Sequence, residues 1–226
     1  MVGPVAVVLT NLNGFSAHII STRTPPGGVP HTTSGELLGR EGRLVYQPAL
    51  HLKGKRARTV GGLFFIWDVT KRSGYVLSEA LQGYAPIKSD ADAGSLLSIT
   101  KDGIQAEING HSCHRCTAEV VLKDGLKAHV TLWQADDAEH FPVRIESANG
   151  PILTTLDFSE FRLEYPAQEI FLPPDGFTVY ASSVAMMNEL IIRETSITSK
   201  YQFGASDEPV PVNSGNWHQQ APPGMR

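Results

Sequence analysis

The sequence predicts a mainly β protein in which an antiparallel sheet meanders along the chain and one helix follows it. Tight-turn pairs are the first indication: Asn109-Gly110, Asp124-Gly125 and Asn149-Gly150 each stand between β-branched or apolar segments. Such pairs readily adopt the positive φ angles of short hairpin turns. The second indication is that a convincing helical spacing of apolar residues begins only after residue 181.

Composition favours one large β domain followed by a tail. The 226 residues are 41% hydrophobic and 19% charged, which is ordinary for a globular protein with a core. We expect a single domain over residues 1–195, since β domains of this size are commonly undivided. Residues 196–226 contain Glu208-Pro209-Val210-Pro211 and Ala221-Pro222-Pro223-Gly224, a composition typical of an extended or disordered segment.

Charge and hydropathy argue against two kinds of partner. A formal net charge of −4 gives no general attraction to nucleic acid or to an anionic membrane. No run approaches the roughly 18 apolar residues of a spanning helix, so we expect no transmembrane segment. The first cation is Arg23, whereas a secretory leader begins with a basic stretch. The chain is therefore either cytoplasmic or the mature part of an exported protein.

The expected strands follow from alternation and turns. Residues 15–20 alternate as in a strand, whereas residues 5–9 fit either a short strand or a helical turn. Hairpins are expected around Glu41-Gly42 and around residues 71–74. The strand before the second turn, residues 63–68, is apolar on both faces, as in the centre of a sheet. Residues 78–94 include Gly83 and Pro86, and we interpret them as a loop with at most a short helix.

The expected helix begins at Ser182 or Ser183 and runs through Arg193. A serine hydroxyl there can accept a hydrogen bond from a free amide of the first turn. The apolar residues of one face recur at helical spacing, namely Val184, Met187, Leu190 and Ile191.

The segment from His111 to Cys116 contains four candidate metal ligands: His111, Cys113, His114 and Cys116. In a strand, alternate residues point to opposite faces, so the four would not converge. A tetrahedral zinc site would then need a second Cys/His cluster, and the sequence contains none. We therefore expect no metal and no other cofactor. A pair of free thiols, at least one of them buried, is favoured over a disulfide between Cys113 and Cys116, which needs an intervening turn.

Two polar stretches are candidates for chemistry. One contains Asp136, Asp137, Glu139 and His140, which could serve acid–base or calcium chemistry, although a polar loop is the simpler interpretation. The other, residues 51–58, carries Lys53, Lys55, Arg56 and Arg58, and a solvated loop is favoured over a phosphate or anionic-surface contact. No nucleophile elbow, P-loop or zinc-protease motif is present, so the sequence favours a protein that is not an enzyme.

Three motifs together resemble a known family. A Gly-x-x-Cys segment, Gly110 to Cys113, precedes a hairpin whose second strand ends near Trp133. After a short acidic loop comes Phe141-Pro142-Val143-Arg144-Ile145, and a later strand ends in Phe171-Leu172-Pro173-Pro174-Asp175-Gly176-Phe177. In these respects residues 13–181 are similar to the extracytoplasmic lipoprotein-carrier superfamily of LolA and LolB, particularly to its uncharacterised outer-membrane-lipoprotein-sorting-like relatives.

The resemblance implies a curved antiparallel incomplete barrel, or half-barrel, whose open side is covered by helices around an apolar cavity. It also implies export to the periplasm or outer membrane, and binding of a lipid or a lipoprotein acyl chain without catalysis. This chain departs from the carriers because no amphipathic helix precedes the first strand and residues 78–94 are too broken for two covering helices. The cover is then expected to come largely from the helix at 183–193.

The favoured function is binding of a hydrophobic ligand on the concave face, because apolar surface of that extent is rarely left uncovered. The expected cavity lining is Phe64, Trp67, Trp133, Phe158, Met187 and Leu190. The alternative is a structural or interaction module of the cell envelope, with an envelope protein as partner and the concave face filled by its own helix. An enzyme that uses Asp136, Asp137 and His140 is the third option.

Overall fold

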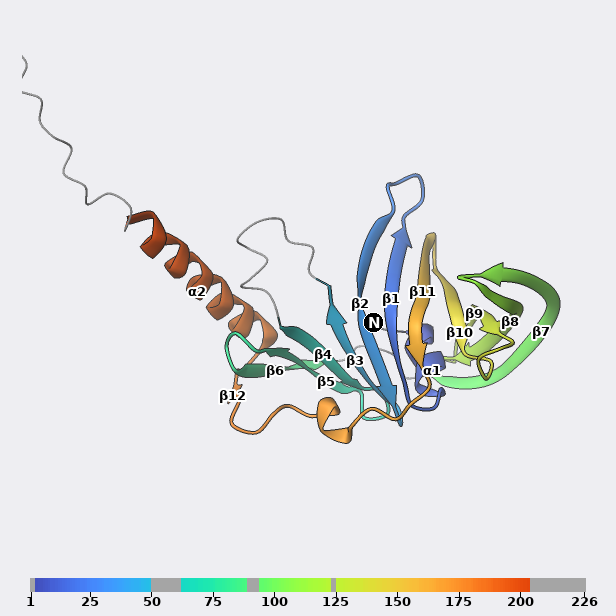
Figure 1. The fold of residues 1–226 in the computed structure, drawn as a ribbon, viewed down its shortest axis with the longest axis horizontal. Coiled ribbons are helices and arrows are strands. Elements are labelled where there is room, and N and C mark those ends of the chain that lie inside the picture. Colours follow the sequence, from blue (N-terminus) through green and yellow to red (C-terminus); the bar gives the residue numbers. More distant parts are fainter. Residues whose placement is uncertain (1–2, 50–61, 89–93, 123–124, 204–226) are drawn as a thin grey trace, which may run out of the picture. The chain divides into compact units, whose positions relative to one another are not determined.

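The computed structural model describes residues 3–49, 62–88, 94–122 and 125–203 (Figure 1). Within these ranges the strands form one 12-stranded sheet. In chain order they are β1 (Phe15–Thr24), β2 (His31–Arg40), β3 (Arg43–Pro48), β4 (Leu63–Asp68), β5 (Ser73–Ser78), β6 (Gly83–Lys88), β7 (Ser95–Ile108), β8 (His111–Val121), β9 (Lys127–Ala135), β10 (Pro142–Asn149), β11 (Ile152–Arg162) and β12 (Thr178–Val179).

The sheet is open rather than closed into a barrel. Its strand order is β12-β6-β5-β4-β3-β2-β1-β11-β10-β9-β8-β7, so β12 and β7 form the two ends. All neighbours pair antiparallel except β12 and β6, which are parallel. The predicted mainly β, antiparallel and incompletely closed fold is confirmed. The two halves of the meander meet at β1, which pairs with β2 on one side and β11 on the other.

The predicted hairpins are present at the predicted turns. At Asn109-Gly110 both residues have positive φ, 53° and 82°, and the flanking Ile108 and His111 are paired. Two successive positive φ angles are the geometry of a type I′ turn, whose twist matches that of the strands. The other turns give the pairs Arg40 with Arg43, Asp68 with Ser73, Val121 with Lys127 and Asn149 with Ile152.

The loop predicted for residues 78–94 is wrong for its middle part, which is strand β6. β6 pairs with β5 along its length, but with β12 only at Gly83 and Tyr84. Pro86 lies beyond those two residues at the outer side of the sheet, where a residue without an N–H group is tolerated. Proline was therefore a misleading sign of a loop here. The predicted basic run at residues 51–58 lies outside the described residues.

A short helix, α1 (Pro4–Thr10), precedes the first strand, so of the two alternatives for residues 5–9 the helical one is correct. Its residues 5–9 are all buried, with side chains between 1% and 7% exposed. α1 contacts β2, β7, β8, β9 and β10, so the sheet curves around it (Figure 1). A helix that is apolar on every side has no amphipathic pattern, and such a helix belongs inside a core.

The main core joins α1 to the concave face of the sheet. Its buried members on the sheet include Phe15, Ala17, Ile19, Leu37, Leu44, Ala118, Val120, Val130, Leu132, Ile145, Leu156 and Phe158. Isolated helices as short as α1 are unstable in water. Its helical structure therefore depends on this packing. On the opposite face, the 3-10 helix η2 (Gln168–Phe171) places Phe171 against Val45, Ile66 and Leu77.

The C-terminal helix α2 (Ser183–Phe203) begins where it was predicted and is longer than predicted. Ser182 caps it, since the Ser182 hydroxyl accepts a hydrogen bond from the Ala185 amide at 3.1 Å. Met186 and Leu190 pack with Leu63, Val76, Leu81 and Ala85. The chain divides into two compact units, residues 1–190 and 191–226, and α2 runs from the first into the second. Residues 196–203 are helical rather than extended, and residues 204–226 lie outside the described residues.

No helix among the described residues is long and apolar enough to cross a membrane.

Candidate functional site

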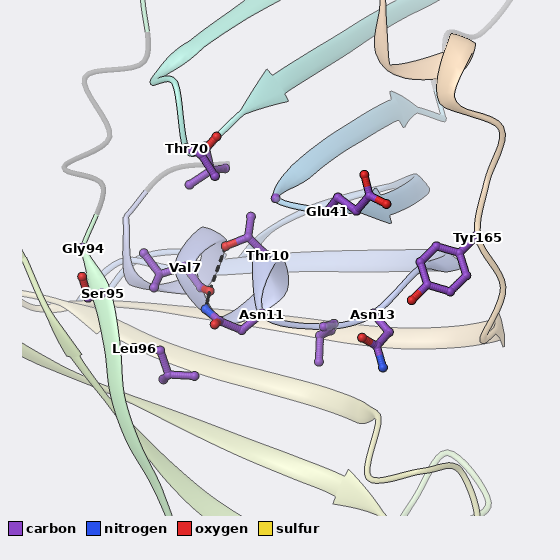
Figure 2. Close-up of a pocket in the computed structure, with 13 residues that line it drawn as sticks. Val7, Thr10, Asn11, Asn13, Glu41, Thr70, Gly94, Ser95, Leu96 and Tyr165 are labelled. Carbon is purple, nitrogen blue, oxygen red and sulfur yellow. Dashed lines mark hydrogen bonds between the residues drawn. The ribbon is translucent and has the colours of Figure 1, made fainter.

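A pocket of about 750 Å³ surrounds the C-terminal end of α1 (Figure 2). It is formed by the end of α1 and the loop after it, the β2–β3 turn, the β4–β5 turn, the start of β7 and the segment after β11. The lining residues are Val7, Thr10, Asn11, Leu12, Asn13, Glu41, Gly42, Val69, Thr70, Gly94, Ser95, Leu96 and Tyr165. The volume is in the range of small-molecule sites.

Side chains of the lining residues close the end of α1. The carbonyl oxygen of Val7 accepts hydrogen bonds from the Thr10 hydroxyl at 3.0 Å and from the Asn11 side-chain amide at 2.6 Å (Figure 2). The last carbonyl groups of a helix have no hydrogen-bond donor within the helix. Thr10 and Asn11 therefore provide donors for the Val7 carbonyl. The polar side of the pocket is thus built by the same groups that end the helix.

Two close contacts hold Tyr165 at the pocket. A Cβ atom on Gly14 would lie 2.5 Å from the Glu164 carbonyl oxygen and 2.7 Å from the Tyr165 Cα, so only glycine permits this approach of the chain. The Arg40 guanidinium lies over the Tyr165 ring, 5.6 Å from its centroid, and donates to the Pro166 carbonyl at 2.9 Å. The Tyr165 backbone therefore lies close beside the loop that follows α1, while most of the side chain is exposed.

Asp68 orders the β4–β5 turn at the other side of the pocket. One of its carboxylate oxygens accepts from the Thr70 hydroxyl at 2.6 Å and from the Lys71 amide at 2.9 Å. Partial burial raises the pKa of Asp68, but these hydrogen bonds and the nearby Lys71 and Arg43 charges outweigh it, and the pKa lies below its usual value. The Val69 amide donates to the Gly42 carbonyl at 3.1 Å, which ties this turn to the β2–β3 turn.

The pocket has apolar walls and a polar rim. Leu12, Val69 and Leu96 line it and also pack against the α1 core, so its apolar wall continues the concave face. Threonine, serine and asparagine side chains line the rest. The described lining residues include one carboxylate, Glu41, and neither histidine nor cysteine. This composition suits the binding of an amphipathic molecule better than acid–base or nucleophilic chemistry, which needs paired groups.

The residues predicted to line a cavity are distributed over separate clusters. Phe158 is fully buried in the α1 core and Trp67 packs against it. Leu190 belongs to the cluster of Leu63, and Met187 packs against it. Phe64 packs with the cluster of Phe171 on the opposite face, and Trp133 with the cluster of Cys113. The structure does not bring the six together in one cavity, and none of them lines the pocket beside α1.

Cys113 and Cys116 are free thiols in the structure, and both are buried. β8 pairs with β9 in unbroken register across both positions, so residues three apart point to opposite faces. Cys116 belongs to the α1 core, where its thiol donates to the Gln134 side chain at 3.2 Å; Cys113 belongs to a second cluster. Burial raises the pKa of both thiols, so neither is a ready nucleophile.

The acidic loop after β9 meets the histidines of β8. His114 is buried, and its Nδ1 lies 2.7 Å from a carboxylate oxygen of Asp136. The His140 ring stands edge-on to the His114 ring, with centroids 5.3 Å apart. The neighbouring pair, His111 and Asp137, is separated by 3.0 Å. Sequence reasoning named these residues but did not join them, because it treated the two stretches separately.

Comparisons with known proteins bear on the fold alone. No protein-family model matches the chain, and no curated protein is found to be related to it. Among solved structures, an uncharacterised conserved protein of Thermus thermophilus is 10% identical, with 78% of this chain and 94% of that chain covered and a TM-score of 0.46. A LolA superfamily protein of Nitrosomonas europaea is 12% identical, with 76% and 98% covered and a TM-score of 0.41.

The lipoprotein LppX of Mycobacterium tuberculosis is 14% identical, with 69% of this chain and 91% of that chain covered and a TM-score of 0.38. A LolA superfamily protein is thus among the solved structures to which this chain is similar. Similarity at this level says nothing about the ligand or the activity of this chain.

Proposed function

We propose that the chain binds an amphipathic lipid, such as a fatty acid or a lipoprotein acyl chain, at the pocket beside α1, without catalysing a reaction. The main support for this proposal is that the pocket and the α1 core share part of their apolar lining. Leu12, Val69 and Leu96 belong to both, so an acyl chain that enters the pocket meets the apolar concave face directly.

The rim supplies what a polar headgroup needs. Asn13, Thr70 and Ser95 offer neutral hydrogen-bonding groups at the pocket, and Glu41 adds a carboxylate. Ligand sites in proteins commonly combine apolar walls with a few polar groups that orient the ligand. The headgroup would therefore stay at the rim while the chain lies along α1.

α1 occupies the face on which a carrier would hold its ligand. The helix is short, its residues 5–9 are apolar and buried, and a helix of this length has little stability of its own apart from its packing. We propose that a long chain takes space next to α1 and shifts it rather than binding in an empty barrel. Export to the periplasm or the outer membrane, as the sequence resemblance implies, belongs to the same proposal.

One observation favours the second candidate function, an envelope interaction module. The concave face is already covered by helices of the chain itself: α1 fills its core, and Met186 and Leu190 of the C-terminal helix pack on the β4–β6 part of the same face. A module of this kind would need no ligand. The two functions therefore differ in whether the protein takes up a lipid.

Titration with a fatty acid that carries a nitrobenzoxadiazole fluorophore tests the proposal. The wild-type protein is expected to bind one molecule saturably. Leu96→Trp fills the pocket wall and is expected to weaken binding at least tenfold. The matched control is Leu97→Trp at the neighbouring residue, which is exposed and outside the lining, and it should bind as the wild type does. Absence of saturable binding to the wild type, or equal binding by both variants, would favour the interaction module.

A further inference from the structure

A second group of side chains lies at the far end of the β8–β9 hairpin. His114, Asp136 and His140 each offer one ligand atom, and these atoms lie within 4.8 Å of one another. The hairpin produces this arrangement: His114 is paired with Gln134, and the Asp136 amide donates to the Ser112 carbonyl at 2.9 Å. The carboxylate is thus held beside the histidine by the sheet ladder.

His140 returns to the same place through a tight turn. Glu139 and His140 have φ angles of 50° and 61°, and the next residue, Phe141, donates to the Ala138 carbonyl at 2.8 Å. The chain then enters β10, and its reversal leaves the His140 ring edge-on to the ring of His114. Two imidazoles and a carboxylate therefore converge from strand β8 and from the two ends of the β9–β10 loop.

The buried imidazole of His114 has one nitrogen without a partner. Its Nδ1 lies 2.7 Å from Asp136, and a carboxylate only accepts, so Nδ1 carries the proton of the neutral ring. Its Nε2 then carries a lone pair, and no hydrogen-bond donor meets this buried atom among the described residues. A buried polar atom without a partner costs free energy, which a bound ligand would recover.

A histidine in this state is prepared to bind a metal through Nε2. Metal-binding histidines usually donate their other ring proton to a carboxylate or carbonyl group, which fixes the tautomer and the direction of the ring. The bond from His114 to Asp136 has this form.

From these contacts we infer that His114 and His140 bind a divalent transition-metal ion such as Zn²⁺, while Asp136 holds the His114 ring in position. Imidazole nitrogens suit zinc, copper or nickel better than calcium or magnesium, which prefer oxygen ligands. The His140 side chain is exposed and can rotate. One of its ring nitrogens can then reach the usual zinc–nitrogen distance, about 2.0–2.1 Å, from an ion that is bound to Nε2 of His114. The remaining coordination positions are then filled by water or another small molecule.

This site is independent of the lipid pocket, since none of its residues lines it. The neighbouring pair of His111 and Asp137 provides a matched control, because it is also a histidine–carboxylate pair at 3.0 Å but is not part of the group. Both His140 and Asp136 are exposed, so substituting them should leave the fold intact.

Calorimetric titration of the untagged, metal-free full chain with Zn²⁺ tests the inference. We expect one ion per wild-type chain, at least tenfold weaker binding by His140→Ala and Asp136→Ala, and unchanged binding by His111→Ala. Co²⁺ as a second probe should give visible absorption typical of a four-coordinate ion in the wild type but not in His140→Ala. Lack of saturable binding, or equal loss in His111→Ala and His140→Ala, would overturn it.

Discussion

The side-chain amide of Asn11 donates a hydrogen bond of 2.6 Å to the carbonyl oxygen of Val7, and this bond closes α1 inside the pocket. Val7 is buried in the core while Asn11 is exposed at the rim, so the bond links the two regions. The helix that fills the concave face therefore ends where a ligand would enter. How firmly that end is held decides how easily α1 can shift.

Loss of this bond should weaken the protein measurably. Asn11→Ala is expected to lower the free energy of unfolding by about 1 kcal/mol, the usual contribution of one hydrogen bond. Urea unfolding followed by circular dichroism measures the change. Asn13→Ala, which alters another lining asparagine, serves as the control. Equal stability of Asn11→Ala and the wild type would show that the end of α1 is not held by this bond.

The packing of α1 should contribute much more. Leu9 is 1% exposed in the core, and truncation of such a residue commonly costs about 2–5 kcal/mol through lost burial and the cavity left behind. Leu9→Ala is expected to lower the unfolding free energy by that amount. Leu97→Ala, at an exposed site, should change it by less than about 0.5 kcal/mol. A cost for Leu9→Ala as small as that for Leu97→Ala would mean that α1 is not part of the core in solution.

The two thiols should be unreactive in the folded protein. Cys113 and Cys116 are buried, and burial raises the pKa of both, so the reactive thiolate is scarce near neutral pH. Treatment with a maleimide and intact-mass analysis is expected to show almost no labelling of the native protein. In urea both thiols should react. Rapid labelling of the native protein would contradict their placement in the core.

Acid should reduce the stability that Asp136 contributes. Its pKa is lowered in the folded state, chiefly by the hydrogen bond with His114, with further contributions from Ser112 and Lys101. A group with a lowered folded-state pKa stabilises the protein above its unfolded pKa, about 3.9, and this contribution is lost as the pH falls through the folded value.

The stability difference between wild type and Asp136→Asn should therefore be largest near neutral pH and shrink as the pH falls below about 4. Urea unfolding of both proteins at several pH values measures it. A difference that stays constant from neutral to strongly acidic pH would show that the carboxylate charge does not contribute.

Several hairpins of the sheet could be predicted from the sequence, but strand β6 and the packing of the core could not. Turn pairs such as Asn109-Gly110 predict hairpins locally, because the required φ angles depend on the residues themselves. The sequence left residues 5–9 undecided between a strand and a helical turn, since a segment buried on all sides carries no amphipathic period. Strand β6 was missed because it contains Pro86. A strand tolerates proline where the proline has no neighbour to donate to, and the local sequence does not show where a strand lies in the sheet.

The two candidate sites differ in how far they could have been predicted. Interpreting Lys123-Asp124-Gly125 as a three-residue turn predicts that Leu122 lies opposite Leu126 and, counting outward, that His114 lies opposite Gln134, as is found. Extending the predicted hairpin in this way would have joined the histidine to the acidic loop. The lipid pocket could not have been found in this way. Its lining comes from segments as distant as Val7 and Tyr165, and only the tertiary fold brings them together.

Native mass spectrometry of the full chain, purified without detergent and followed by organic extraction, shows whether the protein carries a lipid. We expect one bound lipid per chain in the wild type, identified in the extract, and a clear reduction in Leu96→Trp relative to Leu97→Trp. A clean ligand-free mass, with no uptake of an added fatty acid, would contradict lipid binding and leave a module whose concave face is permanently filled by α1.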